Sequence, residues 1–280
     1  MSPQDQIILI TGASSFLASH VADYFLRAGY QVRGTVWSST TAKKATLSIV
    51  GDIAKPGAFD PAVHGVHGVI HAALPFQVFG IEDNERDLLK PAINGMLNIL
   101  KAPGHVYSKL DCNPTTYEAV AAKGAPAGLA YSTLKVVSER VAWDFVKNNE
   151  LKSDLSRLNT LLSKSSDAVL ENMFWSSMDM RDVAEAHLRA FEVPKSGGKR
   201  FFIYKGNFTY QQFMDALWEN VPEIRDRVLV GVPGTGSVPA NVYTINTSKS
   251  QRILGLKYQP LEETIVNAAR SLLKLEEKSV

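Results

Sequence analysis

The feature that most constrains this chain is a short aliphatic run that leads directly into a tight turn and an amphipathic helix. Ile7–Ile10 has four aliphatic residues in a row, which is typical of a buried parallel strand. The turn begins at Thr11-Gly12, and apolar residues recur at helical spacing over Phe16–Ala28 until Gly29 closes the helix. A buried strand that leads into a helix is the first half of a right-handed βαβ unit, so a parallel sheet is expected.

The rest of the first half repeats the alternation of strands and helices. Further strands are predicted at Tyr30–Val36, Leu47–Val50 and Val66–His71, and helices at Leu88–Leu100 and Leu129–Asn148. We therefore predict an α/β fold with a doubly wound parallel sheet of the Rossmann type. Residues 1–150 are expected to form a dinucleotide-binding domain, and residues 151–280 a smaller, mainly substrate-binding part that interleaves with it.

The second half has fewer regular patterns. Apolar residues at helical spacing predict helices at Met180–Phe191, Tyr210–Asn220 and Leu261–Leu275. The Gly197-Gly198 turn favours a strand at Lys199–Tyr204. The glycine-rich stretch Gly231–Gly236 follows no strand-to-helix turn, so we expect it to be a loop.

Composition excludes several classes of protein. The chain has 280 residues with 30 basic and 28 acidic side chains, a net charge of +2, and shows no block of like charge. This balance argues against nucleic-acid binding and against a polybasic membrane anchor. The single cysteine, Cys112, excludes an internal disulfide and a multi-cysteine zinc site, so a reducing, cytoplasmic location is expected. No apolar run is long enough to span a membrane, and polar Met1–Gln6 shows no leader pattern.

The turn after the first strand is where a dinucleotide fold binds pyrophosphate. Backbone N–H groups and the positive end of the helix face the anion there. Gly12 supplies the tight turn, but Ser15 stands where a glycine usually lets the backbone approach the phosphates. A plain strand–turn–helix connection is the alternative interpretation. The candidate cofactor contacts in this turn are Gly12, Ser14, Ser15, Phe16 and Leu17.

A series of stretches along most of the chain matches one family in order. They are Thr11–Ala18, Val32–Val36, Gly51–Ile53, Pro56–Asp60, Val69–Pro75, Pro91–Leu100, Tyr131–Lys135, Arg181–Ala184, Ala186-His187 and Gly198–Phe202. On these residues the chain resembles an extended short-chain dehydrogenase/reductase. Within that family it is most similar to the dihydroflavonol-reductase-like branch and its fungal NADPH-dependent aldehyde and ketone reductases.

The resemblance implies a nicotinamide dinucleotide cofactor. It can be NAD, which has a ribose 2′-OH, or NADP, which has a 2′-phosphate. Gly34–Ser39 contains no acid that would hold the ribose 2′-OH of NAD. NADP-dependent relatives have a basic residue at the position of Trp37, whose ring can stack on adenine but cannot pair with a phosphate. Arg33, Lys43 and Lys44 are the remaining nearby cations. NADP is therefore preferred over NAD.

The resemblance also assigns cofactor contacts after the third and fourth strands. Asp52 and Ile53 match the pair that contacts adenine. Ala72, Ala73 and Pro75 match the wall beside the ribose and nicotinamide.

A tyrosine and a lysine one helical turn apart are the candidate catalytic pair. A free phenol has a pKa of about 10, and a neighbouring ammonium favours its ionised form. Tyr131 and Lys135 are the one Tyr–Lys pair at i, i+4 spacing in the chain. In the family, the tyrosine protonates the substrate oxygen, and the lysine also holds the cofactor ribose.

The chain departs from the family around the fifth and sixth strands. Relatives have an apolar strand and a serine pair after the position of Leu100, whereas this chain has only Pro103–Ser108. Ser108 is the candidate remnant of the family's substrate-orienting serine, and a loop serine is the alternative. Leu151–Ser166 also lacks a sixth strand, so segments near the active site are predicted to be trimmed.

The predicted function is NADP(H)-dependent reduction of an aldehyde or ketone. A cofactor-binding protein without turnover and a sugar-nucleotide epimerase or dehydratase remain open. His64, His67 and His71 lack a good fourth ligand, so no metal site is predicted. The expected partner is a small carbonyl substrate; its identity, the direction of flux and the oligomeric state are left open by the sequence.

Overall fold

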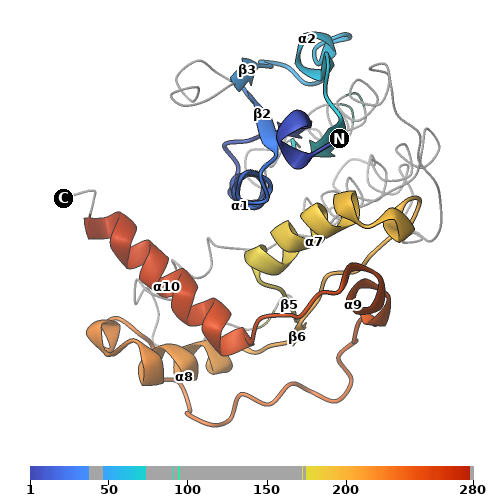
Figure 1. Cartoon of the computed structure of the whole chain (residues 1–280). Helices are drawn as coiled ribbons and strands as arrows, with labels where there is room; N and C mark the ends of the chain where they lie inside the picture. Colours follow the sequence, from blue (N-terminus) through green and yellow to red (C-terminus); the bar gives the residue numbers. More distant parts are fainter. Residues whose placement is uncertain (38–46, 74–89, 91–93, 95–171, 173–174, 278–280) are drawn as a thin grey trace. The chain divides into compact units, whose positions relative to one another are not determined.

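The computed structural model describes residues 1–37, 47–73, 90, 94, 172 and 175–277, and the statements below concern these residues (Figure 1). The chain divides into two units. The first comprises Met1–Glu150 and Ala184–Phe201, and the second comprises Leu151–Val183 and Phe202–Val280. Each unit has its own hydrophobic core.

The first unit is built on a parallel sheet. Its strands are β1 (Ile7–Thr11), β2 (Gln31–Val36), β3 (Leu47–Ile49) and β4 (Gly68–His71), in the order β3-β2-β1-β4. The chain thus moves outward from β1 to β3 and returns to pair β4 with the other side of β1. This order confirms the predicted doubly wound parallel sheet, and it places the topological switch between β1 and β4.

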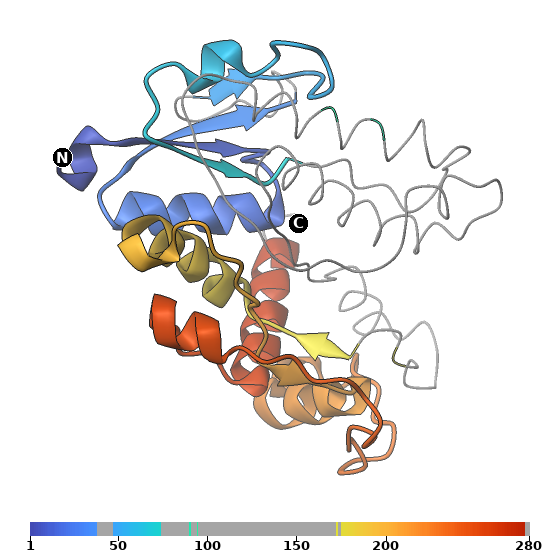
Figure 2. The ribbon, with the colours of Figure 1, turned by 90° about the vertical axis from the view of Figure 1, so that its right-hand side faces the viewer.

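Successive side chains of β1 point to opposite faces of the sheet, so the core of the first unit has two layers. Ile8 and Ile10 are fully buried against α1 (Phe16–Arg27) and the C-terminal part of α7 (Met180–Glu192). Leu9 points to the opposite face, where it packs near α2 (Asp60–Val63). Figure 2 shows α1 and α7 on one side of the strands and α2 on the other. Strands buried on both faces explain why β1 is a continuous aliphatic run.

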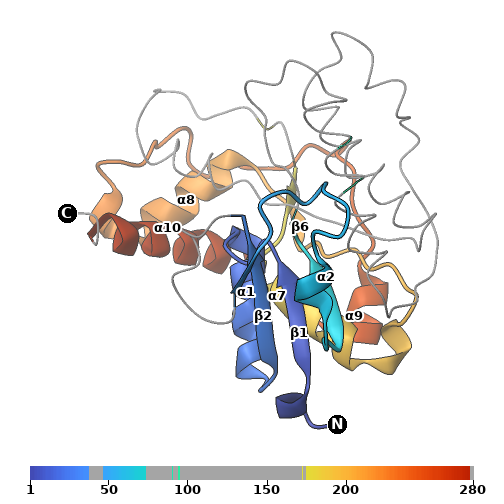
Figure 3. The same cartoon turned by 90° about the horizontal axis from the view of Figure 1, so that it is seen from above.

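The second unit combines a short ribbon with helices. β5 (Ser176–Ser177) and β6 (Gly206–Asn207) pair antiparallel. Its helices are α8 (Tyr210–Asn220), α9 (Ser248–Leu254) and α10 (Leu261–Glu277), and a short 3₁₀ turn lies at Pro222–Ile224 (η4). Two more 3₁₀ turns, Pro3–Asp5 (η1) and Pro194–Ser196 (η3), belong to the first unit. Figures 1 and 3 show α8 beside α10.

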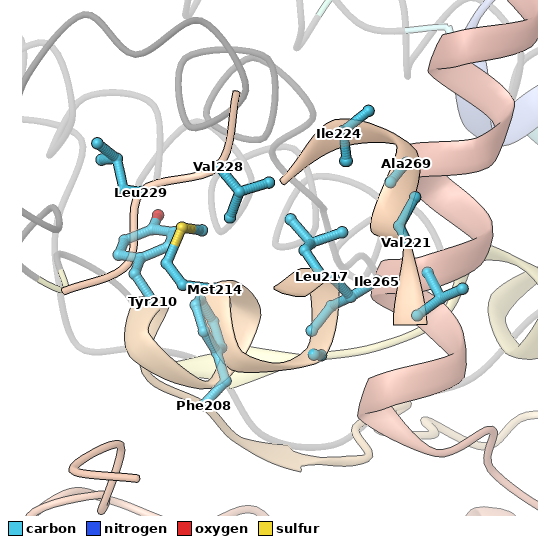
Figure 4. Packing of buried hydrophobic residues seen from close by; sticks show 12 residues of the cluster. Phe208, Tyr210, Met214, Leu217, Val221, Ile224, Val228, Leu229, Ile265 and Ala269 are labelled. Atoms are coloured by element: carbon cyan, nitrogen blue, oxygen red, sulfur yellow. The ribbon is translucent and has the colours of Figure 1, made fainter. Parts of the chain in front are cut away.

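The core of the second unit lies between α8 and α10. Met214 and Leu217 from α8 meet Ile265 and Ala269 from α10, and all four are buried (Figure 4). The Thr209 side chain caps the start of α8 by accepting the N–H of Gln212, whose side chain in turn accepts the N–H of Thr209. This reciprocal capping box satisfies two N–H groups at the helix start.

The predicted loop at Gly231–Gly236 is confirmed, and α8 holds it in place. The N–H of Val232 donates to Oε1 of Gln211, and the N–H of Gly234 donates to Oδ2 of Asp215. Gln211 also donates to Asp215 and to the carbonyl of Val230. The backbone N–H groups of this glycine-rich loop therefore bind two side chains of α8, the carboxylate of Asp215 and the amide oxygen of Gln211.

Most predicted elements of the described regions are confirmed to within two residues at each end, but the strand at Lys199–Tyr204 is wrong. Pairing begins only after it, where the N–H of Lys205 donates to the carbonyl of Ser177. Ile203 and Tyr204 are buried without joining a ladder, and the carbonyl of Phe202 accepts the hydroxyl of Ser250. Tertiary packing, not strand pairing, buries these apolar residues.

Two predicted helices are not covered by the structure. Leu88–Leu100 and Leu129–Asn148 lie outside the described residues, apart from Lys90 and Asn94, which are helical.

Candidate functional site

The turn between β1 and α1 requires a glycine at position 12. Gly12 has φ +63°, and a Cβ there would lie 3.1 Å from Cα of Ala73, at the end of β4. The N–H of Gly12 donates to Oγ1 of Thr35 and that of Ala13 to the carbonyl of Thr35. The structure thus brings together Gly12 and Ala73, two predicted cofactor contacts, at the switch point of the sheet.

Gly34 is a second glycine of this site, and the sequence analysis did not single it out as one. A Cβ on Gly34 would lie 2.8 Å from Cβ of Ala13 and 2.5 Å from Cδ2 of Leu47. Gly34 therefore lets the turn lie directly against β2. A glycine inside a strand pattern is a signal of such close approach and could have identified it.

The start of α1 can accept an anion. Ser15 is its N-cap, and its Oγ accepts the N–H of Ala18 at 3.4 Å. The N–H groups of Phe16 and Leu17, in the first turn, have no acceptor within the helix, and the helix dipole adds positive charge there. Ser14, Ser15 and Phe16 are exposed. The N–H groups at the helix start point outward, and the neighbouring Gly12 has no space for a side chain. This arrangement fits the pyrophosphate of a dinucleotide.

Thr11 joins the end of β1 to the end of β4. Its buried Oγ1 accepts the N–H groups of Ala72 and Ala73, each at 3.0 Å, and lies 2.9 Å from Nδ1 of His71. Because two N–H donors occupy its lone pairs, the Thr11 hydroxyl donates to His71. Thr11 therefore fixes the backbone at Ala72 and Ala73. The sequence analysis did not identify this role, because the partners are far along the chain.

The ends of β2 and β3 hold the other predicted cofactor contacts. Trp37 follows β2 and is 70% exposed. Asp52 is exposed, and its Oδ1 accepts the N–H of Ala54 at 2.8 Å. Ile53 is half-buried against the cluster around Leu9 and Phe59. Trp37 and Asp52 are thus both at the edge of the sheet where parallel strands end.

One guanidinium nitrogen of Arg33, a predicted cofactor contact, has a structural role. Its Nη1 donates to the carbonyls of Ala62 at 2.8 Å and His64 at 2.7 Å. This nitrogen therefore holds the end of α2 and the residue after it, and Arg33 as a ligand of the 2′-phosphate stays a prediction.

Part of the predicted site lies outside the described residues. These residues are Lys43, Lys44, Pro75, Ser108, Tyr131 and Lys135. Two of the three histidines have structural partners, since Nδ1 of His67 accepts the N–H of Ile7 and His71 contacts Thr11. Within the described ranges, no cluster of metal-ligating side chains occurs, and no helix is long and apolar enough to cross a membrane.

Comparison with protein families gives one match over more than half of the chain. Residues 8–178 match the NAD dependent epimerase/dehydratase family. The match begins in β1 and therefore includes the turn and the start of α1 described above.

Two curated relatives are similar over nearly their whole length. The NADPH-dependent methylglyoxal reductase of Saccharomyces cerevisiae is 29% identical over 96% of this chain and 98% of its own. A ketoreductase of Aspergillus niger is 29% identical over 95% of this chain and 97% of its own. The yeast alignment runs over 342 positions, more than the 280 residues of this chain, so the yeast enzyme has residues without a counterpart here.

A solved structure has the same fold. It is the yeast methylglyoxal/isovaleraldehyde reductase in complex with NADPH, with a TM-score of 0.79 and 28% identity. The similarity covers 97% of this chain and 99% of the yeast chain.

Proposed function

Because this chain belongs to the NAD dependent epimerase/dehydratase family, we propose that it is an NADPH-dependent reductase of a small aldehyde or ketone. The observation that carries the proposal is the similarity over nearly the whole chain to a reductase solved with NADPH. The reverse reaction, oxidation of a CH–OH group, belongs to the same proposal. The domain roles follow from it: the first unit binds the cofactor, and the second unit mainly binds substrate.

The described residues supply one half of a cofactor site. The N–H groups of Phe16 and Leu17 and the hydroxyl of Ser15 would hold the pyrophosphate, and Gly12 allows its approach. Ala72 and Ala73 would form the wall beside the ribose, with Pro75 next to them in sequence. Trp37, Asp52 and Ile53 would contact the adenine end, and Lys43 is a further proposed contact. Arg33 is a proposed contact at the same end, and its Nη1 also donates to the carbonyls of Ala62 and His64.

The proposed chemistry needs a proton at the carbonyl oxygen. When bound, the reduced nicotinamide supplies a hydride to the carbonyl carbon. Tyr131 donates a proton to the oxygen, and the Lys135 ammonium favours the phenolate that remains. Lys135 also holds the ribose, and Ser108 orients the substrate oxygen.

The contrasting functions have less support. The two curated relatives and the solved structure reported above are named reductases, not epimerases or binding proteins. We propose that the residues this chain lacks belong to the family's fifth and sixth strands, at the positions of Pro103–Ser108 and Leu151–Ser166 in this chain. These strands lie near the active site in the family, so we propose that turnover is slow. The cytoplasmic location stays a prediction that rests on the single cysteine.

Turnover and NADPH binding in wild type and two variants test the reaction. Tyr131→Phe should abolish reduction and leave NADPH affinity nearly intact, because the phenol acts on the substrate oxygen. Lys135→Ala should damage both, because its ammonium serves the phenol and the ribose. General acid catalysis accelerates reactions by roughly 10²–10⁴, so Tyr131→Phe should lose activity in that range or more.

The outcomes separate the competing functions. Wild type that binds NADPH and reduces no carbonyl in a broad panel would show a binding protein. Full activity in Tyr131→Phe would leave the reaction in place and remove its proposed acid. Tyr30→Phe is the matched control and should leave turnover unchanged, because Tyr30 precedes β2 at the amino end of the strand, opposite the proposed cofactor contacts.

A further inference from the structure

Where α8 ends, the chain turns back and places two charged side chains at the surface of the second unit. Val221, before the turn η4, and Ile224, at its end, are buried in the core with residues of α10 (Figure 4). The next two residues, Arg225 and Asp226, are exposed. Trp218, in the last turn of α8, is 40% exposed. This surface therefore combines an indole ring with one charge of each sign.

The guanidinium of Arg225 is held in place by one of its three nitrogens. Nε donates to the carbonyl of Trp218 at 2.7 Å, and the guanidinium carbon lies 5.7 Å from the centroid of the Trp218 ring. A cation is attracted both to the face of an indole and to the carbonyl end of a helix. Among the described residues, Nη1 and Nη2 of Arg225 have no hydrogen bond or ion pair. The structure thus fixes the guanidinium and leaves its outer edge to a ligand.

Trp218 and Arg225 line an open pocket of about 610 Å³. Val228 and Leu229, which are buried, form its apolar floor, and Val230, which is 46% exposed, lies at its rim. Small-molecule sites typically have volumes of about 300–1,000 Å³ and combine apolar walls with a few polar groups. In the described part of the chain, the lining includes none of the residues proposed for cofactor binding or catalysis. The pocket is therefore a candidate site for a separate ligand.

We propose that this pocket binds an organic monocarboxylate with a flat apolar body. The planar edge of the Arg225 guanidinium matches the two oxygens of a carboxylate, which it can bind with two parallel hydrogen bonds. The Trp218 ring and the aliphatic floor accept the apolar body. Asp226 lines the same pocket, and its negative charge repels a second negative charge on the ligand. The site therefore favours a monoanion over a dianion such as a phosphate or a dicarboxylate.

Titration with hydrocinnamate, followed by NMR of the indole N–H groups, tests the proposal. The chain has four tryptophans, and Trp218→Phe identifies the Trp218 signal by removing it. This signal should shift saturably with a dissociation constant of about 1 mM, as expected for a small ligand in an open site. Arg225→Gln should raise that constant about tenfold, because the charged hydrogen bonds are lost. Arg225→Lys is the matched control: it keeps the charge without the planar fork and should raise the constant less.

Two analogues of the probe test the role of charge without any change to the protein. Hydrocinnamyl alcohol has the same apolar body without the carboxylate and should bind about tenfold more weakly. Benzylsuccinate adds a second carboxylate and should also bind more weakly than hydrocinnamate at fixed ionic strength. Asp226→Asn removes the repelling charge, so it should abolish the difference between benzylsuccinate and hydrocinnamate.

Three results would overturn the proposal. The first is equal affinity for hydrocinnamate and its alcohol, or no shift of the Trp218 signal at about ten times the expected dissociation constant. The second is unchanged affinity in an Arg225→Gln variant whose thermal unfolding matches wild type. The third is a Trp218 signal that shifts with protein concentration instead of probe concentration, since a second copy of the chain would then cover the pocket. The measurement uses neither cofactor nor turnover, so its outcome is independent of the proposed reductase function.

Discussion

Thr11 is the residue whose single side chain connects two strand ends at the switch point. Thr11→Val keeps the shape of the side chain and removes the hydroxyl that accepts the N–H groups of Ala72 and Ala73. An unsatisfied buried donor costs about 1–3 kcal/mol, and both N–H groups are only partly buried, so we expect a loss of about 1–3 kcal/mol in the free energy of unfolding. Urea titration measures it. Thr11→Ser keeps the hydroxyl and is the control; equal stability of the two variants would contradict the assignment.

Ser15 combines a helix cap with a Cβ at the phosphate turn. Ser15→Gly removes that Cβ and should tighten NADPH binding, because the backbone can approach the phosphates more closely. The loss of the cap to Ala18 should cost the fold only a few tenths of a kcal/mol, since glycine is itself a tolerated N-cap.

Ser15→Ala is the matched control for that measurement. It keeps the Cβ and loses the hydroxyl, so we expect weaker helix capping, by about 1 kcal/mol, and no gain in affinity. Calorimetric titration with NADPH and thermal unfolding together measure both effects. Unchanged or weaker binding in Ser15→Gly would mean that the hydroxyl itself contributes to binding.

At the level of elements, a buried carboxylate ties the first turn of α7 to α10. Asp179 is 5% exposed, accepts two hydrogen bonds from the Arg181 guanidinium and one from the backbone N–H of Arg181, and accepts the hydroxyl of Thr264. Burial alone would raise the pKa of Asp179, but these hydrogen bonds outweigh it and hold the pKa below its ordinary value of 3.8. Because the folded-state pKa is lowered, this stabilisation is present above pH 3.8 and is lost as the pH falls through the folded-state value.

Asp179→Asn should therefore destabilise the protein in a pH-dependent way. We expect a loss of about 1.5–3 kcal/mol at neutral pH, the usual contribution of hydrogen bonds to a charged group. The difference from wild type should shrink as the pH falls from 3.8 through the lower folded-state pKa of Asp179. Urea midpoints of both proteins across this range measure it. Thr264→Val removes one bond and should show a smaller loss; a difference that does not change with pH would contradict the ionised state of Asp179.

At the level of the whole molecule, the two units have separate cores, and the proposed cofactor contacts among the described residues all belong to the first. NADPH at 100 times its dissociation constant should stabilise the unit that binds it by about 2.7 kcal/mol. Hydrogen exchange of core amides in β1 should slow by up to about 100-fold, and exchange in α8 should slow less. Mass spectrometry measures both sets of amides in one sample. Equal slowing in α8 and β1 would show that the units open together.

The sequence alone determined the elements that depend on local patterns. The aliphatic run at β1, the turn at Gly12 and the helical spacing of α1, α8 and α10 each lie within one stretch of chain, so their periodicity predicts them. The order of strands and helices also predicted the doubly wound sheet, since few topologies accommodate it.

Tertiary structure alone decided how distant residues use their side chains. Thr11 finds its donors 61 and 62 residues away, and Arg33 binds carbonyls 29 and 31 residues away, so no local pattern distinguishes a structural role from a cofactor contact. The same holds for Ile203 and Tyr204, which are buried without pairing in a strand, so that their apolar pattern resembles that of a strand. Periodicity reports which side chains are buried, whereas hydrogen-bond partners are fixed only when the folded chain brings remote groups together.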